Sequence, residues 1–418
     1  MDSTAPATAI EGAPRTRVAV VGAGGIARTS HLSALRAHAD RTELVAVVDV
    51  DGERAQAAAR EWAADPELGT SGVRPYTDVH AMLAAEQPGL VHVCTPPSTH
   101  RDAVVAALDA GAWAWCEKPA VLSLDELDDV RSHERPGGPF ASFVAQHRFG
   151  SAGRRLRQLA ASGELGRPLV AVCHTLWFRP PAYFEVPWRG RWATEGGGPT
   201  MGHGIHQVDL LLAVLGDWRS VTAVARTLDR EVETEDVSAA LVVMESGAVV
   251  SVVNSLLSPR EESYLRFDFS DATVEVNHLY GYDNAAWRWT PAPHVADAEG
   301  GAARSAGWAP VDDVRSSHAA QLGDLLDAMA AGERPPVSGD DAARTLELVA
   351  ALYASAASGR EVRRGEVAGG PFAASMDGGG RVSAVLRPPP SALSAQSAPP
   401  DPLGSALSAE SAQGEVAR

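Results

Sequence analysis

The chain has 418 residues, of which 45% are hydrophobic and 21% charged, enough to bury a large core in two or three domains. Its formal charge of −17 argues against nucleic acid or an anionic membrane as a partner, because those surfaces attract clustered cations. There is no run of about 18 apolar residues, and the cysteines Cys94, Cys116 and Cys173 have no metal-binding or disulfide spacing. We therefore expect a globular protein of the reducing cytoplasm.

Composition marks the ends of the folded part. Residues 1–14 are predicted to be flexible, and residues 367–418 are rich in Ala, Ser, Pro and Gly, which predicts a disordered, low-complexity tail. Between them we expect two domains, at residues 15–145 and 146–366.

The first domain alternates strand and helix patterns along the chain. Apolar, β-branched runs at 16–21, 42–51, 89–100 and 112–119 predict strands, and the segments at 27–38, 52–64, 101–111 and 123–132 have helical character. Such alternation predicts an α/β fold with a parallel, doubly wound Rossmann sheet.

A glycine-rich turn joins the first predicted strand to its helix. Gly22, Gly24 and Ala27 give the pattern G-x-G-x-x-A. The first glycine permits the tight turn, the second lets the backbone approach a pyrophosphate, and the small Ala27 lets helix and strand pack closely. An ordinary glycine turn is the alternative. In this context the pattern predicts a dinucleotide site at a helix N-terminus.

Asp49 specifies the dinucleotide. It lies at the end of the second predicted strand, 49 − 25 = 24 residues after Gly25. There a carboxylate would accept hydrogen bonds from the ribose hydroxyls of NAD and repel the 2′-phosphate of NADP. Val50 and Asp51, which follow, supply no cation for that phosphate, so we expect NAD rather than NADP.

Lys118 is the only lysine in the chain, since the basic total of 36 leaves 36 − 1 = 35 arginines. An ammonium is a compact charge whose pKa falls on burial, whereas a guanidinium stays charged and spreads its donors in a plane. Lys118 is therefore a candidate for proton chemistry. The alternative is a lysine that survived by chance in an arginine-rich composition.

The second half of the chain has strand patterns joined by turns, at 167–178, 220–228, 236–246, 247–257 and 263–278. Several alternate between apolar and polar residues, which is typical of antiparallel sheets. Amphipathic helices are predicted at 318–332 and 341–359.

A histidine cluster lies where a buried helix is predicted to begin, over residues 205–215. His203, His206 and Asp209 recur at intervals of three, on one broad face. They are candidates for substrate chemistry; the alternatives are polar groups bonded to the helix start and a metal site. We expect no metal, because hydride transfer to NAD needs none and the sequence shows no second ligand cluster.

The segment before the histidines is rich in aromatic and arginine residues: Trp177, Arg179, Tyr183, Trp188, Arg189 and Trp192. Aromatic faces and guanidinium groups suit a sugar ring that carries hydroxyl or carboxylate groups. Core packing under a loop is the alternative for each aromatic residue.

The stretches VGAGGIA, VVDVD, CTPPSTH, GAWAWCEKP and GGGPTMGHGIHQVDLL, in this order, resemble the Gfo/Idh/MocA family of glucose-fructose oxidoreductases and inositol dehydrogenases over residues 16–365. The resemblance implies a Rossmann domain followed by an α/β domain with a large, mostly antiparallel open sheet. It also implies NAD(P)-dependent chemistry on sugars, polyols and related compounds, and assembly as a homodimer or homotetramer.

The resemblance and the motifs together give the expected site. For the cofactor they name Gly22, Gly24, Gly25, Ile26, Ala27, Asp49, Thr95, Pro96, Pro97, His100, Glu117 and Lys118. For the substrate they name Lys118, His203, His206, Asp209, Arg189 and Trp192, with Lys118 and His206 as the catalytic pair.

The chain departs from the family pattern at Gly202, where many members carry the first Asp of D-x-G-x-H-x-x-D. This puts a Lys-Asp-His proton relay in doubt, although His203 is next to the missing position. Two other functions stay open: an NAD-dependent glycosidase that oxidises its substrate transiently, and a non-catalytic sugar or nucleotide sensor on the same fold.

Overall fold

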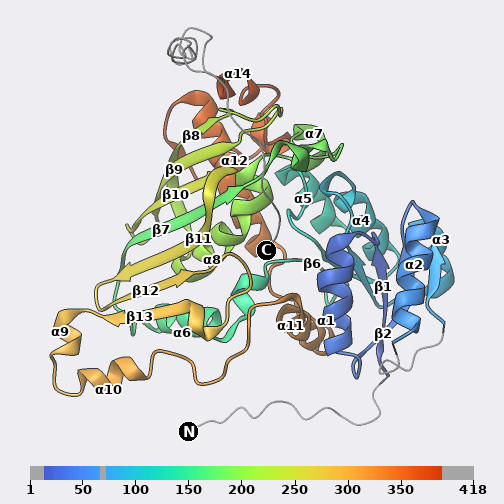
Figure 1. Cartoon of the computed structure of the whole chain (residues 1–418), viewed down its shortest axis with the longest axis horizontal. Coiled ribbons are helices and arrows are strands. Elements are labelled where there is room, and N and C mark those ends of the chain that lie inside the picture. The colour runs from blue at the N-terminus through green and yellow to red at the C-terminus, as the bar shows by residue number, and fades with distance from the viewer. Residues whose placement is uncertain (1–13, 66–71, 388–418) are drawn as a thin grey trace, which may run out of the picture. The chain divides into compact units, whose positions relative to one another are not determined.

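The computed structural model describes residues 14–65 and 72–387 (Figure 1). The predicted flexible segment falls outside this part except for residue 14, as does the predicted tail beyond residue 387.

The first half forms a parallel sheet in the strand order β3-β2-β1-β4-β5-β6. Its strands are β1 (Thr16–Val21), β2 (Thr42–Val48), β3 (Arg74–Tyr76), β4 (Leu90–Val93), β5 (Trp113–Cys116) and β6 (Ala141–Phe143). Most of their residues are buried, as expected for a sheet covered on both faces. Strand order reverses between β1 and β4, which opens a crevice at their carboxyl ends.

Helices connect these strands and cover the sheet (Figure 1). They are the π-helical turn η1 (Ala27–His31), α1 (Leu32–Ala37), α2 (Gly52–Ala63), α3 (Val79–Glu86), the short turn η2 (Pro97–Thr99), α4 (His100–Asp109) and α5 (Leu124–Ser132). Asp51 caps α2 by accepting hydrogen bonds from the backbone N–H groups of Glu53 and Arg54. The predicted α/β fold is confirmed.

The second half forms a larger sheet in the order β13-β12-β11-β7-β10-β9-β8-β14. Its strands are β7 (Pro168–Phe178), β8 (Trp218–Arg226), β9 (Val237–Met244), β10 (Val249–Ser255), β11 (Leu257–Phe269), β12 (Ala272–Asn277), β13 (Trp287–Pro291) and β14 (Val362–Arg363). Neighbouring strands are antiparallel except β7 and β10. The expected mostly antiparallel sheet is therefore confirmed.

Helices and turns complete this half. They are η3 (Gln146–Phe149), α6 (Ser151–Ser162), η4 (Pro181–Glu185), α7 (Trp192–Glu195), η5 (Thr200–Gly204), α8 (Ile205–Leu215), η6 (Asn284–Ala286), α9 (Pro293–Ala296), α10 (Gly301–Ala306), α11 (His318–Ala331), α12 (Asp340–Ser358), α13 (Pro371–Ala374) and α14 (Ser383–Leu386). Helix α8 spans the predicted residues and is buried almost all round. This burial holds the first turn of α8 in place.

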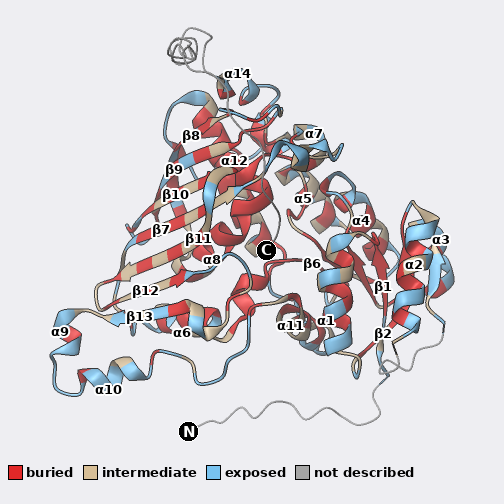
Figure 2. Ribbon diagram, viewed as in Figure 1, coloured by how far each residue is buried: buried red, intermediate tan, exposed pale blue. Residues whose placement is uncertain are grey.

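One face of the larger sheet packs on helices, and the other is more exposed (Figure 2). Strands β8 and β9 alternate between buried and exposed residues along their length. Helix α12 packs on β8, so the buried face is the one toward α8 and α12.

Two features differ from the predicted domain boundaries. Residues 371–387 are ordered, because Phe372, Met376, Val382 and Leu386 are buried in the main core; the predicted tail therefore begins too early. Helix α11, expected with the second domain, packs on α1 and places Leu322, Leu325 and Leu326 in the core of the first domain. Across residues 14–65 and 72–387, no helix has the length and apolar character needed to cross a bilayer.

Candidate active site

The glycine turn lies in the crevice between β1 and β4. Gly22 has φ of +94°, and a Cβ there would lie 2.7 Å from the carbonyl oxygen of Cys94. Only glycine fits both the backbone angle and this close approach. By contrast, a Cβ added at Gly24 or Gly25 would meet no atom within 4 Å, so both glycines border open space.

A cavity of about 1300 Å³ begins at this turn and extends to the first turn of α8. Of the residues predicted for the cofactor, it is lined by Gly22, Gly24, Gly25, Ile26, Asp49, Thr95, Pro96, Pro97, Glu117 and Lys118. A tight turn with open space beside its glycines and an acid at the end of β2 fits a dinucleotide.

Two residues predicted for the cofactor do not line the cavity. Ala27 is buried in the core, where its small side chain packs under the turn. His100 is also buried, and its ring nitrogens lie 2.8 Å from the carbonyl oxygens of Thr95 and Pro119. His100 therefore connects two cavity loops and does not face a ligand.

Asp49 is held by the backbone at the cavity wall. Its carboxylate accepts hydrogen bonds of 2.9 Å from the N–H groups of Ala23 and Asp51. Arg54, to which no sequence motif points, also lines the cavity, with Nε 3.9 Å from Asp49 Oδ1 and 2.9 Å from Asp51 Oδ2. A cation is therefore present beside the acid.

Lys118 follows β5 and reaches across the crevice. Its Nζ donates a 2.8 Å hydrogen bond to the carbonyl oxygen of Gly202. Burial lowers the pKa of Lys118, and the carboxylates of Glu117 and Glu195 oppose that shift. The lysine can therefore give up its proton more readily than an exposed lysine.

Glu117 lies behind Lys118 with its carboxylate fully engaged. Its Oε1 is 3.1 Å from Nε2 of His31 and 2.8 Å from Nε2 of His318, and Oε2 accepts from the backbone N–H of Lys118. Burial would raise the pKa of Glu117, but the hydrogen bonds from the two histidines outweigh it and hold the pKa well below its usual range. Glu117 is thus a fixed anion.

His31, Glu117 and His318 form a buried cluster that the sequence spacing did not predict. Their ring-nitrogen and carboxylate-oxygen atoms lie within 4.8 Å of one another. They come from η1, the end of β5 and the start of α11, so only the tertiary fold brings them together. In the structure they hydrogen-bond to one another.

His203 and His206 both line the cavity, as predicted. The His206 ring stacks on His147 at 5.1 Å, whereas His203 lies edge-on to Trp177 at 5.2 Å, with Nε2 3.4 Å from the hydroxyl of Tyr183. Burial, and then the charge of Lys118, lower the pKa of both histidines well below the ordinary 6.5. Both imidazoles are therefore neutral near pH 7 and available to accept a proton.

Arginine and aromatic side chains surround the far end of the cavity. The Arg179 guanidinium lies 4.7 Å from the centre of the Trp177 ring, and that of Arg189 lies 3.9 Å from the Tyr183 ring and 4.3 Å from the Trp188 ring. All of these side chains line the cavity. Trp192 does not: its Nε1 donates to the carbonyl oxygen of Glu233, and its ring packs on Tyr353.

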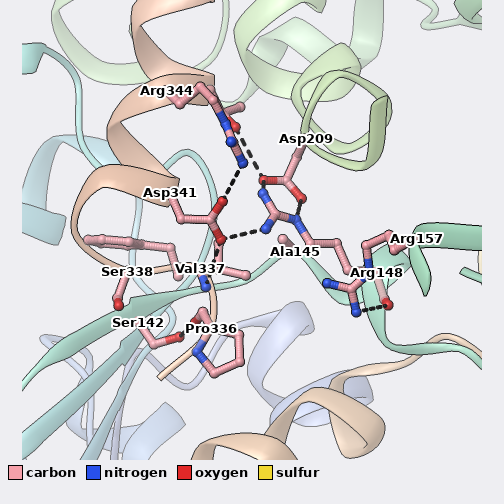
Figure 3. A network of polar contacts seen from close by, with 12 residues as sticks. Ser142, Ala145, Arg148, Arg157, Asp209, Pro336, Val337, Ser338, Asp341 and Arg344 are labelled. Atoms are coloured by element: carbon pink, nitrogen blue, oxygen red, sulfur yellow. Dashed lines mark hydrogen bonds and ion pairs between the residues drawn. The ribbon is translucent and has the colours of Figure 1, made fainter. Parts of the chain in front are cut away.

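Asp209 also does not line the cavity, which differs from its predicted role at the substrate. Arg148 binds both of its carboxylate oxygens at 2.5 Å and also bonds Asp341, so the Arg148 guanidinium lies between the two acids (Figure 3). Thr345 adds a 3.3 Å hydrogen bond. Asp209 lies in α8, six residues beyond His203 of η5, and reaches this buried network instead of the cavity.

Besides Arg54, the cavity contains two further residues of interest that sequence reasoning missed. Glu195 ends α7 and is buried, and Tyr280 follows β12 and lies edge-on to the His206 ring at 5.6 Å. The position of Glu195 directly before three glycines was the one available signal for it. Tyr280 is more than 70 residues from the histidines along the chain, and no spacing links them.

Comparison with known proteins gives matches to both halves of the chain. Residues 16–138 match the model of an oxidoreductase family with an NAD-binding Rossmann fold, and residues 154–277 match the GFO/IDH/MocA C-terminal domain. D-apiose dehydrogenase of Paraburkholderia graminis is 30% identical over 83% of this chain and 89% of its own length.

Two further relatives bear on the ligands. A D-xylose 1-dehydrogenase of Haloferax volcanii, named for NADP(+), is 28% identical over 82% of this chain and 98% of its own. The WlbA dehydrogenase of Chromobacterium violaceum, solved with NADH and UDP-GlcNAcA, is 27% identical with a TM-score of 0.71, covering 84% of this chain and 96% of that one.

Proposed function

Because this chain belongs to the GFO/IDH/MocA family of oxidoreductases, we propose that it transfers a hydride between NAD and a secondary alcohol or ketone of a sugar, polyol or related compound. The observation that carries this proposal is one continuous cavity. It is lined at one end by the glycine turn and Asp49, and at the other by Lys118 and His206.

NAD, when bound, supplies the hydride acceptor for alcohol oxidation. The turn at Gly22–Gly24 would hold the pyrophosphate, and Asp49 the ribose hydroxyls. NAD is the cofactor we propose, with Asp49 favouring it over NADP; Arg54 is the residue that moderates this preference.

Two side chains share the proton chemistry in this proposal. His206, neutral and buried beside Lys118, takes the hydroxyl proton of the substrate. Lys118 donates a hydrogen bond to the oxygen that gains negative charge, because its ammonium is compact enough to approach that oxygen. His203 and Tyr183 bind neighbouring hydroxyl groups.

The residues around the far end favour a substrate that is flat on one side and polar at its edge. Trp177, Tyr183 and Trp188 offer ring faces, and Arg179 and Arg189 offer donors for a hydroxyl, carboxylate or phosphate group. The WlbA relative was solved with a nucleotide-linked sugar acid, so sugar acids belong among the candidates.

A substrate screen tests this function. Polyols, aldoses, sugar acids and nucleotide sugars are each incubated with the protein and NAD, and NADH is followed by its absorbance, with Lys118→Ala as the blank. We expect at least one compound to produce NADH with the native chain only. A different result would contradict this proposal: no compound yields net NADH, but a leaving group is released in the presence of NAD. The chain would then be an NAD-dependent glycosidase that oxidises its substrate transiently.

We also propose that the chain self-associates through the exposed face of its larger sheet. Val170, Val224, Leu241 and Val249 lie on that face and are 43% to 58% exposed. Apolar side chains gathered on one sheet face are typical of a protein interface. Light scattering should give a dimer or tetramer, and Leu241→Glu should lower the mass; a monomer in the native protein would contradict this.

The cytoplasm is the location that we propose. All three cysteines are free and buried, which suits a reducing compartment. Fractionation with an antibody against the chain would test this location, and recovery in the exported fraction would contradict it.

A further inference from the structure

Glu195 is a buried carboxylate that is only half engaged. Its Oε2 accepts a 2.6 Å hydrogen bond from the backbone N–H of Gly190, while Oε1 lies 3.7 Å from Nη1 of Arg189. The residue lines the cavity. One oxygen is therefore anchored by the backbone, and the other is directed toward the cations of the cavity.

The second carboxylate oxygen of Glu195, Oε1, lies near Gly202, the residue whose carbonyl oxygen binds Lys118. A Cβ built on Gly202 would come within 3.5 Å of Glu195 Oε1, and the carbonyl oxygen of the same glycine accepts the hydrogen bond from Lys118 Nζ. A side chain at position 202 would thus point at the Glu195 carboxylate. Because residue 202 is glycine, no side chain at this position stands between the Glu195 carboxylate and the peptide of Gly202.

We propose that Glu195 is the counter-ion that sets the protonation state of Lys118, acting as a positioning residue for the proposed hydride transfer, on which this inference rests. Glu117 cannot adjust in this way, because both of its oxygens already accept N–H groups. Glu195 has one oxygen free to gain a proton, so its charge can change while the backbone anchor stays.

The electrostatics agree with this geometry. Burial raises the pKa of Glu195, and the hydrogen bond from Gly190 and the charges of Arg189 and Lys118 oppose that shift. The charged and titratable groups that face Lys118 from the surrounding elements are Glu117, Glu195, Arg179, Arg189, His147, His203 and His206. Among them Glu195 is the carboxylate that shares a cavity surface with the lysine and is not saturated with donors.

The lone lysine makes the test direct. Amine-directed labelling of the full chain without substrate, read by peptide mass spectrometry, gives the midpoint of the Lys118 titration. Glu195→Gln keeps the volume and an oxygen to accept from Gly190, but removes the charge, which disfavours the ammonium. The Lys118 midpoint should therefore fall by about one pH unit. An unchanged midpoint would overturn the inference.

Glu235→Gln is the matched control. Glu235 is a second buried carboxylate beside the same glycines, bonded to the N–H groups of Gly198 and Thr200 and to Tyr353, but it does not line the cavity. Its substitution should lower the melting temperature and leave the Lys118 midpoint unchanged. An equal midpoint shift in both variants would mean a general structural effect and overturn the inference.

Gly202→Asp tests the same coupling with the opposite sign and does not depend on the folding of Glu195→Gln. A Cβ at position 202 meets only ordinary van der Waals contact, and the negative charge of the added carboxylate should raise the Lys118 midpoint. In Glu195→Gln/Gly202→Asp, the midpoint should return toward the native value. No upward shift in either chain would contradict the proposal.

This measurement separates the inference from the proposed function. Labelling needs no substrate, so a shifted midpoint with no NADH from any compound would leave the counter-ion role intact and remove the dehydrogenase. Turnover with an unshifted midpoint would do the reverse. With an active substrate, Glu195→Gln should also move the alkaline limb of kcat/KM to lower pH, as expected if Lys118 must be protonated.

Discussion

The ammonium of Lys118 lies 2.8 Å from the carbonyl oxygen of Gly202. This contact connects the end of β5 with η5, the turn that carries His203 and leads into α8. The only lysine of the chain therefore joins the expected cofactor loops to the histidine segment, which is the position a group handling both ligands requires.

Lys118 should be protected from amine-directed labelling by NAD together with substrate. Its labelling should also titrate below the ordinary value of about 10.4, because burial lowers the pKa of Lys118. Lys118→Arg should lose most turnover although it keeps the charge, since a guanidinium neither fits the ammonium position nor releases a proton readily. Near-normal turnover, together with labelling that neither ligand changes, would mean that Lys118 has no catalytic role and was retained by chance.

His206 and His203 should differ in their effect on catalysis. His206→Ala should lower turnover by about 10² to 10⁴, as removal of a general base does. His203→Ala should act mainly on KM, because His203 lies against Trp177 and the Tyr183 hydroxyl at the far end of the cavity. NAD affinity, measured by fluorescence quenching, serves as the control and should change little. Small and equal losses would favour purely structural roles.

The native protein should bind NAD more tightly than NADP, and Asp49→Ser should narrow that difference. Removing the carboxylate removes its repulsion of a 2′-phosphate. Arg54 then loses its contact with Asp49 and keeps only Asp51 as an acidic neighbour, so its guanidinium can bind the phosphate. A charge-assisted hydrogen bond of about 1.5 to 3 kcal/mol corresponds to a gain of roughly 10- to 100-fold for NADP. Adding Arg54→Ala should cancel this gain. Tighter binding of NADP by the native chain would contradict the prediction.

Asp209→Asn should cost stability and leave ligand binding nearly unchanged. The change weakens the buried contact with Arg148, which then keeps only Asp341 as a charged partner in this network (Figure 3). Breaking a buried ion pair costs about 3 kcal/mol or more, which urea denaturation would measure. A stable variant with a large rise in KM would instead return Asp209 to the substrate site.

His147→Phe should make the protein less sensitive to acid. Burial, and then the charges of His318 and Lys118, lower the pKa of His147 from 6.5 to about 3. Below pH 6.5, His147 is therefore protonated in the unfolded chain, whereas in the folded chain it stays neutral down to about pH 3. Because the unfolded state gains the proton, the free energy of unfolding decreases as the pH is lowered. This group contributes up to about 1.4 kcal/mol per pH unit to that decrease.

Phenylalanine keeps the ring that stacks on His206 and removes the titration. The slope of unfolding free energy against pH, from urea curves between about pH 5 and 6, should then be shallower by about 1.4 kcal/mol per unit. Equal slopes in His147→Phe and the native chain would refute the assignment.

The cofactor half of the site was predictable from local patterns. Gly22, Gly24 and Asp49 follow strands that are apolar throughout, and parallel strands bring their carboxyl ends to one edge of the sheet. The cavity is accordingly lined by ten of the twelve residues named for the cofactor. Ala27 and His100 do not line it, because packing under a turn and facing a ligand look the same in sequence. The contacts of the other ten residues with the cofactor stay a prediction.

The substrate half depended on tertiary structure. Asp209 has the spacing of a site residue, but α8 is buried on nearly every side, so its faces meet different partners and Asp209 meets Arg148. Trp192 lies on α7, where its ring packs on Tyr353 and its Nε1 donates to the carbonyl oxygen of Glu233.

The sequence by itself determined the parallel sheet, the glycine turn, the acid that follows the second strand and the single lysine, because each depends on neighbouring residues whose pattern reflects local geometry. The arrangement of the larger sheet was expected from the family resemblance. Only the tertiary structure decided that Glu195 occupies the space over Gly202, that Arg54 stands beside Asp49, and that His31 and His318 hold Glu117 as an anion. The contacts of Glu117 with His31 and His318 join segments far apart in the chain. Glu195 and Gly202, and likewise Asp49 and Arg54, are close in sequence, and the folding of the turn between them brings their side chains together. Their distances are set by how the sheets and helices pack, which no local spacing encodes.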